Sequence, residues 1–298
     1  MEKHTAFIFP GQGSQYKGMA DSLKEWAPAK PFFEEFMHQM GYDFTLMSDD
    51  ELSVTQVTQP SLFTLSCIHY EYLKSLGHTP FITAGHSLGE YTALYAAGAF
   101  SFADGLSLVA CRGRLMHEVS LENAGKMAAI IGLDLEKVCR ICQDCSKDNE
   151  IVEAVNINAK NQIVISGNHQ AVETACLKAK ELGAKRAIVL QVSAPFHSSI
   201  MRNIRKDFVQ KIEEISFHRP NIMVVQNVDG KIHQDPFRLK HNLVMQLYSP
   251  VRWVDCMEEM SIKGAQRFME CGPKKVLSSL AKSMGFEANS SEDMLNKQ

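Results

Sequence analysis

The chain alternates short apolar runs with longer amphipathic stretches, an order that is typical of α/β proteins. Apolar runs bounded by turn residues predict buried strands at residues 5–9, 81–83, 222–226 and 268–271. Apolar residues at helical spacing predict helices at residues 18–47, 61–76, 91–97, 102–119, 201–215, 238–247 and 275–284, with a further helix that ends at 263. We therefore expect an α/β fold.

The pattern changes at Gly125, and strand-like and helical segments then follow in a different order. Strands are predicted at residues 127–133, 151–159, 161–167 and 184–192, and helices at 134–147 and 169–182. This β-α-β-β-α-β order is the ferredoxin-like arrangement. We therefore expect an inserted α+β subdomain at 125–192, between two parts of a large subdomain at 1–124 and 193–298. The polar tail from Ala288 predicts a frayed C-terminus.

Composition and charge narrow the class of protein. The chain has 298 residues and a formal net charge of −3, which argues against a dedicated nucleic-acid binder. No apolar stretch is long enough to cross a membrane, so no membrane partner is expected. The first residues lack the apolar core and cleavage site of a signal peptide, and we expect a cytoplasmic location.

Eight cysteines lie scattered through apolar segments, a distribution that suits reduced thiols. Cys139, Cys142 and Cys145 have the C-x-x-C-x-x-C spacing of some iron–sulfur ligand runs. However, this segment is predicted to be helical, no fourth ligand adjoins it, and no Cys-Pro follows. We therefore favour structural cysteines that pack as small apolar residues, with a cluster site as the alternative.

Residues 85–89 read Gly-His-Ser-Leu-Gly, the Gly-x-Ser-x-Gly pattern of a nucleophile elbow. A predicted strand precedes the motif and a predicted helix follows it, which is the context that the pattern requires. Gly85 and Gly89 let the backbone turn sharply, so that Ser87 can stand exposed at a helix N-terminus. The alternative is a glycine-rich turn with an ordinary serine.

A serine nucleophile needs a general base, which is usually a histidine. Among eleven histidines, His197 lies in a predicted loop between a strand and a helix, and loops often carry catalytic residues. His86 adjoins Ser87 in sequence, and such neighbours rarely face each other. A separate loop with Gly11 and Gly13 follows the first strand; it could cradle a phosphate or bring backbone N–H groups over a site.

Several motifs resemble those of the malonyl-CoA:acyl carrier protein transacylase family, the discrete acyltransferases of fatty-acid and polyketide synthesis. They run in family order across nearly the whole chain. The matching residues are 9–15, 58–60, 85–90, 112–113, 158, 164–167, 193–197, 227–228, 249–253 and 270–273. The resemblance implies an α/β-hydrolase-like core with an inserted ferredoxin-like subdomain, in agreement with the pattern above.

The resemblance also implies roles for individual residues. It makes Ser87 the nucleophile and His197 its base, with the histidine held by a backbone carbonyl near Arg252 rather than by an aspartate. The backbone N–H groups of Gln12 and Leu88 match the positions of the oxyanion hole.

Arg112 matches the family position that binds the free carboxylate of a malonyl group, which a guanidinium can hold through two parallel hydrogen bonds. Phe196 resembles the residue of malonyl-selective members, since its ring leaves less room for an α-methyl group. His86 and Asn158 match supporting positions.

The implied reaction moves a malonyl group from malonyl-CoA to Ser87, and then to the phosphopantetheine thiol of an acyl carrier protein. It needs no metal or redox cofactor. The motifs at 193–197 and 249–253 favour polyketide over fatty-acid synthesis, with a polyketide synthase that lacks its own acyltransferase as a further partner.

Two other functions remain as alternatives. Acyl hydrolases that clear carrier proteins resemble this family but tend to lack the arginine, so Arg112 argues against that reading. A non-catalytic carrier-binding module is disfavoured because Ser87, His197 and the Gln12 loop are all present.

Overall fold

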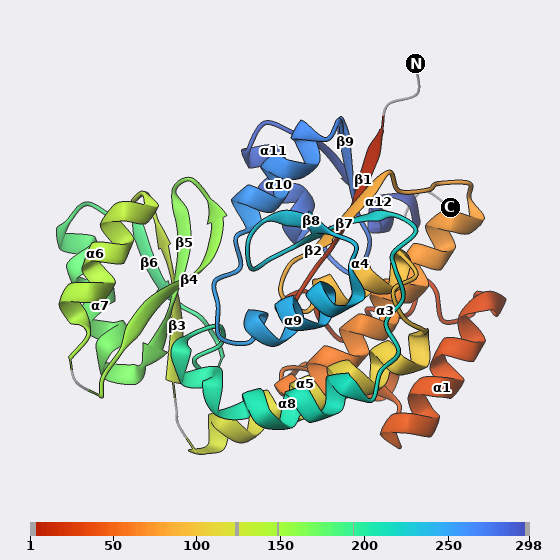
Figure 1. The fold of residues 1–298 in the computed structure, drawn as a ribbon, viewed down its shortest axis with the longest axis horizontal. Coiled ribbons are helices and arrows are strands. Elements are labelled where there is room, and N and C mark those ends of the chain that lie inside the picture. Colours follow the sequence, from red (N-terminus) through yellow and green to blue (C-terminus); the bar gives the residue numbers. More distant parts are fainter. Residues whose placement is uncertain (1–3, 123–124, 148, 193, 296–298) are drawn as a thin grey trace.

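The computed structural model describes residues 4–122, 125–147, 149–192 and 194–295, and they form two separate β-sheets with helices around them. Figure 1 shows the smaller sheet, in green, standing to one side of the larger part of the molecule. This arrangement confirms the expected fold class. The expected limits of the three segments stay a prediction, and residues 124 and 193 lie outside the described residues.

The larger sheet has six strands in the order β10-β9-β1-β2-β7-β8. All neighbours pair in parallel except β7 and β8, which are antiparallel. The strands are β1 (Thr5–Phe9), β2 (Ile82–Gly85), β7 (Met223–Gln226), β8 (Lys231–His233), β9 (Arg267–Glu270) and β10 (Glu287–Ser290). The short β8 was not predicted from the sequence.

Helices cover both faces of this sheet. In β1, Phe7 and Phe9 pack into the core on one face, whereas Ala6 and Ile8 pack on the other, because successive side chains of a strand point to opposite faces. The first face carries α1 (Lys30–Met40), α3 (Thr55–Ser75), α4 (Gly89–Ala96), α5 (Phe102–Glu122), α8 (Arg205–Glu213) and α9 (Pro236–Gln246). The second carries α10 (Trp253–Ile262) and α11 (Val276–Ser283).

The smaller sheet is antiparallel, with the strand order β4-β5-β3-β6. Its elements are β3 (Gly125–Ile131), α6 (Leu135–Cys145), β4 (Val152–Ala159), β5 (Gln162–Asn168), α7 (His169–Glu181) and β6 (Arg186–Val189). Both helices pack on one face, and Cys142 and Cys145 are buried in that core while Cys139 is half-buried. Met127 and Val164 on the opposite face join the core of the larger part.

Two helix predictions were wrong. Residues 18–47 do not form one helix: α1 ends at Met40, because the φ of 75° at Gly41 terminates it. The short elements η1 (Ala27–Ala29), η2 (Phe44–Leu46) and α2 (Asp49–Leu52) flank it. Helix α3 begins at Thr55 and continues through Pro60, where the sequence predicted its start at residue 61. Burial of nearly the whole helix outweighs the backbone hydrogen bond that the proline removes.

The C-terminal tail is ordered over the described residues, so the expectation of a frayed end from Ala288 was wrong. Strand β10 pairs with β9, and α12 (Ser291–Leu295) follows it. Ser291 lies 2.7 Å from the buried ring of His69, and Glu292 accepts a hydrogen bond of 2.9 Å from Tyr16. The polar composition of the tail did not indicate a strand, because strand pairing uses backbone groups rather than side chains.

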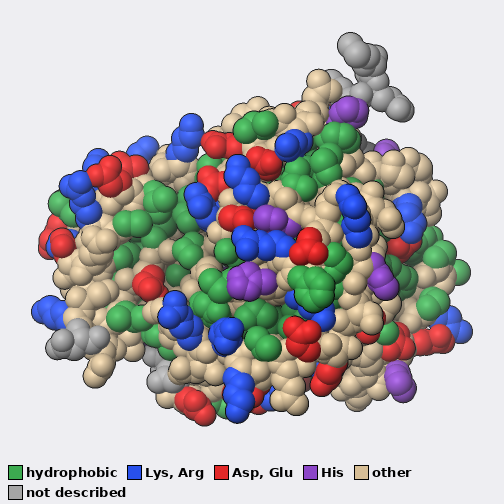
Figure 2. Space-filling model, in the orientation of Figure 1, with side chains coloured by type: hydrophobic (Ala, Val, Ile, Leu, Met, Phe, Trp, Pro, Cys, Tyr) green, Lys and Arg blue, Asp and Glu red, His purple; other side chains and the backbone are tan. Residues whose placement is uncertain are grey.

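The surface carries charges of both signs. On the face shown in Figure 2, basic and acidic side chains are interspersed, as the nearly equal counts of 31 and 34 lead one to expect. None of the helices in the described ranges is long and apolar enough to cross a bilayer.

Candidate active site

Ser87 lies in a sharp turn between β2 and α4, as the elbow pattern predicts. Its φ of +52° is in the left-handed region, which is strained for a residue with a side chain. The turn is possible because Gly85 and Gly89 pass very close to their neighbours. A Cβ on Gly85 would lie 1.8 Å from the Gly89 carbonyl carbon, and one on Gly89 would lie 2.0 Å from the Phe9 carbonyl oxygen.

His197 reaches Ser87 from the loop before η3 (Ser199–Ile204). Its Nε2 atom lies 2.6 Å from the Ser87 Oγ, and its own φ is +63°. The two residues that the sequence proposes as nucleophile and base are thus brought together, and both have strained backbones. Such outliers persist only where the surroundings hold them.

The second ring nitrogen of His197, Nδ1, lies 2.8 Å from the backbone carbonyl oxygen of Gln246. A carbonyl can only accept, so Nδ1 carries the proton and Nε2 presents a lone pair to Ser87. The sequence led us to expect a backbone carbonyl near Arg252; Gln246 lies six residues before Arg252, and the Ser249 backbone, three residues before it, also hydrogen-bonds the ring. The side chain of Arg252 is half-exposed and pairs with Asp255.

Burial, and after it the positive charge of Arg112, lowers the pKa of His197 to about 3. The imidazole is therefore neutral near pH 7 and can accept a proton. No carboxylate of the described residues holds the ring in place; its hydrogen bonds to the protein backbone are to Gln246 and Ser249.

Arg112, on α5, is buried beside Ser87 with 2% of its surface exposed. Its Nη2 atom donates to the Ser87 Oγ at 3.0 Å and to the Gln246 Oε1 at 3.3 Å, while Nη1 donates to the Gln59 Oε1 at 2.6 Å. The Tyr91 ring lies beneath the guanidinium, with 5.5 Å between Cζ and the ring centroid.

All of these partners are neutral. Among the described residues, no carboxylate lies within 4 Å of the Arg112 guanidinium, and its Nε has no hydrogen-bond partner. A buried cation without an anion in direct contact is costly, so the arrangement favours binding of a small anion next to Ser87.

Gln12 and Leu88 flank the same point. A Cβ on Gly11 would lie 2.5 Å from the His86 carbonyl oxygen, so the Gln12 loop presses against the elbow. Thr55 and Lys274 hold this loop through hydrogen bonds to the Gln12 side chain and the Gly13 carbonyl. Within the described part of the chain, neither the Gln12 nor the Leu88 backbone N–H donates to a protein acceptor.

The remaining residues proposed from the sequence also lie at the site. His86 Nε2 is 2.8 Å from the Asn158 Oδ1, and this contact joins the elbow to β4 of the smaller sheet. The buried ring of Phe196 lines the pocket together with His197.

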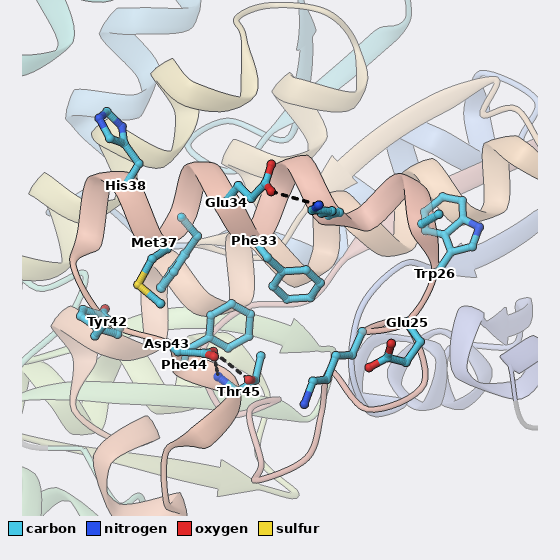
Figure 3. Close-up of a pocket in the computed structure, with 14 residues that line it drawn as sticks. Glu25, Trp26, Phe33, Glu34, Met37, His38, Tyr42, Asp43, Phe44 and Thr45 are labelled. Carbon is cyan, nitrogen blue, oxygen red and sulfur yellow. Dashed lines mark hydrogen bonds and ion pairs between the residues drawn. The ribbon is translucent and has the colours of Figure 1, made fainter.

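The hollow over Ser87 measures about 100 Å³, which suits an acyl group of a few atoms. Gln12, Leu190, Val192 and Phe196 also line an adjoining hollow of about 400 Å³. A larger groove of about 640 Å³ lies beside α1, where Figure 3 shows Phe33, Tyr42 and Phe44. None of its described lining residues is a serine or cysteine, whereas Ser87 lines the smaller hollow.

Sequence reasoning missed a set of buried polar residues behind Ser87: Glu90, Gln226, Asn227, Asn242 and Gln246. One local signal was present. In α9 the buried stripe begins at Leu239 and includes Asn242 and Gln246, three and seven residues later. Amides at core positions of an amphipathic helix indicate a buried polar network.

Comparisons with known proteins agree with this geometry. The family model described as "Acyl transferase domain" matches residues 6–292. A malonyl CoA-acyl carrier protein transacylase from Staphylococcus aureus is 42% identical over 283 residues, which cover 93% of this chain and 91% of the relative.

Two solved structures are similarly close. An acyl carrier protein S-malonyltransferase from Vibrio cholerae is 40% identical, with a TM-score of 0.91 over 98% of this chain and 99% of the other. A malonyl-transacylase in complex with its type II PKS acyl-carrier protein is 38% identical, with a TM-score of 0.92 over 99% of this chain and 100% of the other.

Proposed function

Since the chain belongs to the acyl transferase family, we propose that it is a malonyl-CoA:acyl carrier protein S-malonyltransferase. The observation that carries the proposal is the buried guanidinium of Arg112, which contacts Ser87 Oγ and otherwise meets only neutral groups. A malonyl thioester supplies the anion that this site lacks, at a fixed distance from the carbonyl that Ser87 attacks.

In the first step, Ser87 Oγ attacks the thioester carbonyl carbon and its proton passes to His197 Nε2. The oxyanion of the tetrahedral intermediate accepts hydrogen bonds from the backbone N–H groups of Gln12 and Leu88. The C–S bond then breaks, and the coenzyme A sulfur takes the proton from His197. A malonyl-serine ester remains.

In the second step, the phosphopantetheine thiol of an acyl carrier protein gives its proton to His197 Nε2 and attacks the ester. The Ser87 oxygen leaves and recovers the proton from His197. The hollow of about 400 Å³ beside Gln12 and Phe196 gives room for the pantetheine arm. Neither step requires a metal or redox cofactor.

The acyl group accepted at this site is small and acidic. The hollow over Ser87 is about 100 Å³, far less than a long acyl chain needs, and the Phe196 ring forms part of its wall. We infer that malonyl is preferred over both methylmalonyl and long acyl groups.

We further propose that the carrier protein belongs to polyketide synthesis. The motifs at 193–197 and 249–253 support a carrier of polyketide synthesis over one of fatty-acid synthesis, and Ser193 lies outside the described residues. The malonyl-transacylase in complex with a type II PKS carrier is 38% identical, whereas the Vibrio cholerae and Staphylococcus aureus relatives are 40% and 42% identical. Malonyl transfer to the two kinds of carrier in direct competition tests this preference. The cytoplasmic location expected from the sequence stays a prediction.

Intact mass after mixing with malonyl-CoA or acetyl-CoA tests the activity. We expect a malonyl adduct on the wild-type protein, none on Ser87→Ala, and much less on Arg112→Ala. Equal labelling by acetyl-CoA, regardless of Arg112, would contradict malonyl selectivity. An adduct that water removes faster than a carrier protein does would instead support the acyl hydrolase.

A further inference from the structure

Glu90 is a fully buried carboxylate one turn after Ser87, with 0% of its surface exposed. Its Oε2 accepts hydrogen bonds from the Asn227 backbone N–H at 2.7 Å and from the Gln246 Nε2 at 2.9 Å. Its Oε1 accepts one of 2.9 Å from the Gln226 Nε2. No lysine or arginine of the described chain lies within 4 Å of it. A carboxylate so placed orients every donor around it.

Two of these residues, Asn227 and Gln246, also hold the backbone of Ser87. The Ser87 N–H donates to the Asn227 Oδ1 at 2.8 Å, and the Ser87 carbonyl accepts from the Gln246 Nε2 at 3.0 Å. Ser87 thus has both of its peptide groups fixed by residues that Glu90 aligns. Its φ of +52° needs such support, because a strained conformation relaxes when its surroundings allow.

Gln246 also connects Glu90 to Arg112. The amide oxygen of Gln246 accepts from Arg112 Nη2, and its amide nitrogen donates to Glu90 Oε2. The positive end of the amide dipole therefore faces the anion, and the negative end faces the cation. Two buried, opposite charges interact through one amide without touching each other.

We propose that Glu90 is a positioning residue for acyl transfer: it holds Ser87 through Asn227 and Gln246, and it balances the charge of Arg112 while the acyl site is empty. The charge-balancing role rests on the proposed function. The positioning role concerns Ser87 alone and applies to any ester that the serine attacks.

The test compares Glu90→Gln with Glu270→Gln. Glu270 is also fully buried and accepts backbone hydrogen bonds from Leu277 and Ser278, at the N-terminal end of α11. Among the described residues it has no hydrogen bond to Ser87, His197 or Arg112. This control therefore measures the general effect of neutralising a buried glutamate in this protein.

Two probes separate the two roles of Glu90. p-Nitrophenyl acetate acylates Ser87 without a carboxylate for Arg112, and malonyl-CoA requires Arg112. We expect Glu90→Gln to slow acylation by both probes about 100-fold, because the serine loses its alignment. At pH 8, where Glu90 is ionised, the half-saturating concentration of malonyl-CoA should fall, because Arg112 loses a competing negative charge. Glu270→Gln should keep the wild-type values for both probes.

Wild-type acylation rates in folded Glu90→Gln, or an equal loss in Glu270→Gln, would overturn the positioning role. A higher half-saturating concentration of malonyl-CoA would overturn the charge-balancing role. Should Glu90→Gln not fold, Glu90→Asp takes its place: it keeps the charge but shortens the side chain, so ester attack should slow while the half-saturating concentration stays constant. A wild-type protein that reacts with the ester but not with malonyl-CoA would refute the proposed function, and the ester rates would still decide the role of Glu90.

Discussion

His86 and Asn158 form a hydrogen bond of 2.8 Å that joins the turn at Ser87 to the smaller sheet. Backbone hydrogen bonds extend this junction, since Val251 donates to Val155 at 2.7 Å and accepts from Ile157 at 2.9 Å. The smaller sheet is therefore fixed against the elbow rather than attached only by its two connections. The wall of the acyl pocket depends on this junction.

Asn158→Ala should weaken the junction between the sheets. The partly buried His86 Nε2 loses its partner, so we expect a loss of about 1 kcal/mol of unfolding free energy and slower malonylation of Ser87. Urea unfolding and acylation kinetics measure the two effects. Asn161→Ala, at an exposed turn of the same sheet, is the control. Equal effects in the two variants would contradict the role of the His86 contact.

Arg112→Lys should reduce the preference for malonyl-CoA over acetyl-CoA. Lysine keeps the charge but loses the planar fork, so we expect kcat/KM for malonyl-CoA to fall by about 10- to 100-fold. The value for acetyl-CoA should change little. Arg114→Lys, whose exposed side chain pairs with Glu118, is the matched control. An equal fall for both thioesters would show that Arg112 does not recognise the carboxylate.

Stability should depend on pH through His69. Burial lowers the pKa of this ring to about 3, from 6.5 in the unfolded chain. Between these values the unfolded state binds the extra proton, so stability falls as pH drops from 6.5 towards 3. In His69→Asn, the slope of unfolding free energy between pH 4.5 and 6 should be smaller by about 1.4 kcal/mol per pH unit.

His197 acts in the same direction as His69, and Glu90 in the opposite direction. Burial raises the Glu90 pKa from 4.5 to about 7. The stability that protonated Glu90 contributes is therefore full below pH 4.5 and is lost as pH rises to about 7. Because His197 and Glu90 are present in both the wild type and His69→Asn, their effects on stability cancel when the two proteins are compared. Above pH 7.5 the two proteins should give parallel curves, because the His69 ring is then neutral in both states. Parallel curves below pH 6 as well would contradict the prediction.

Gly89→Ala should severely destabilise the protein. The added Cβ would lie 2.0 Å from the Phe9 carbonyl oxygen, so β1 and the elbow would have to separate, at a cost of at least about 3 kcal/mol. Gly183→Ala meets no atom within 4 Å at a φ of +94°, and should cost about 1 kcal/mol. Urea unfolding distinguishes the two, and similar losses would show that close approach is not what requires Gly89.

The proposed nucleophile could be predicted from the sequence because its signal is local: the elbow is a five-residue pattern. The proposed base, His197, was one candidate among eleven histidines, and only the family resemblance assigned it that role. Arg112 came only from the family resemblance, since an arginine in a helix is usually exposed. The structure distinguishes it by burial beside Ser87.

The polar network behind the serine could not be predicted in the same way. Glu90 and Gln246 meet across 156 positions of sequence, and no local periodicity reports such a contact. The same limit explains why the sequence did not identify the Gln246 carbonyl as a partner of His197. A backbone oxygen carries no side-chain signature, so its identity depends on how α9 docks.

The two sheets contribute unequally to the pocket. Ser87, His197 and Arg112 all come from the part built on the six-stranded sheet, whereas the smaller part contributes wall residues such as Met127, Asn156 and Leu190. Substitutions in the smaller part can therefore change which acyl group fits the pocket without altering Ser87, His197 or Arg112. A fold divided in this way can acquire new substrates in small steps while its chemistry is preserved.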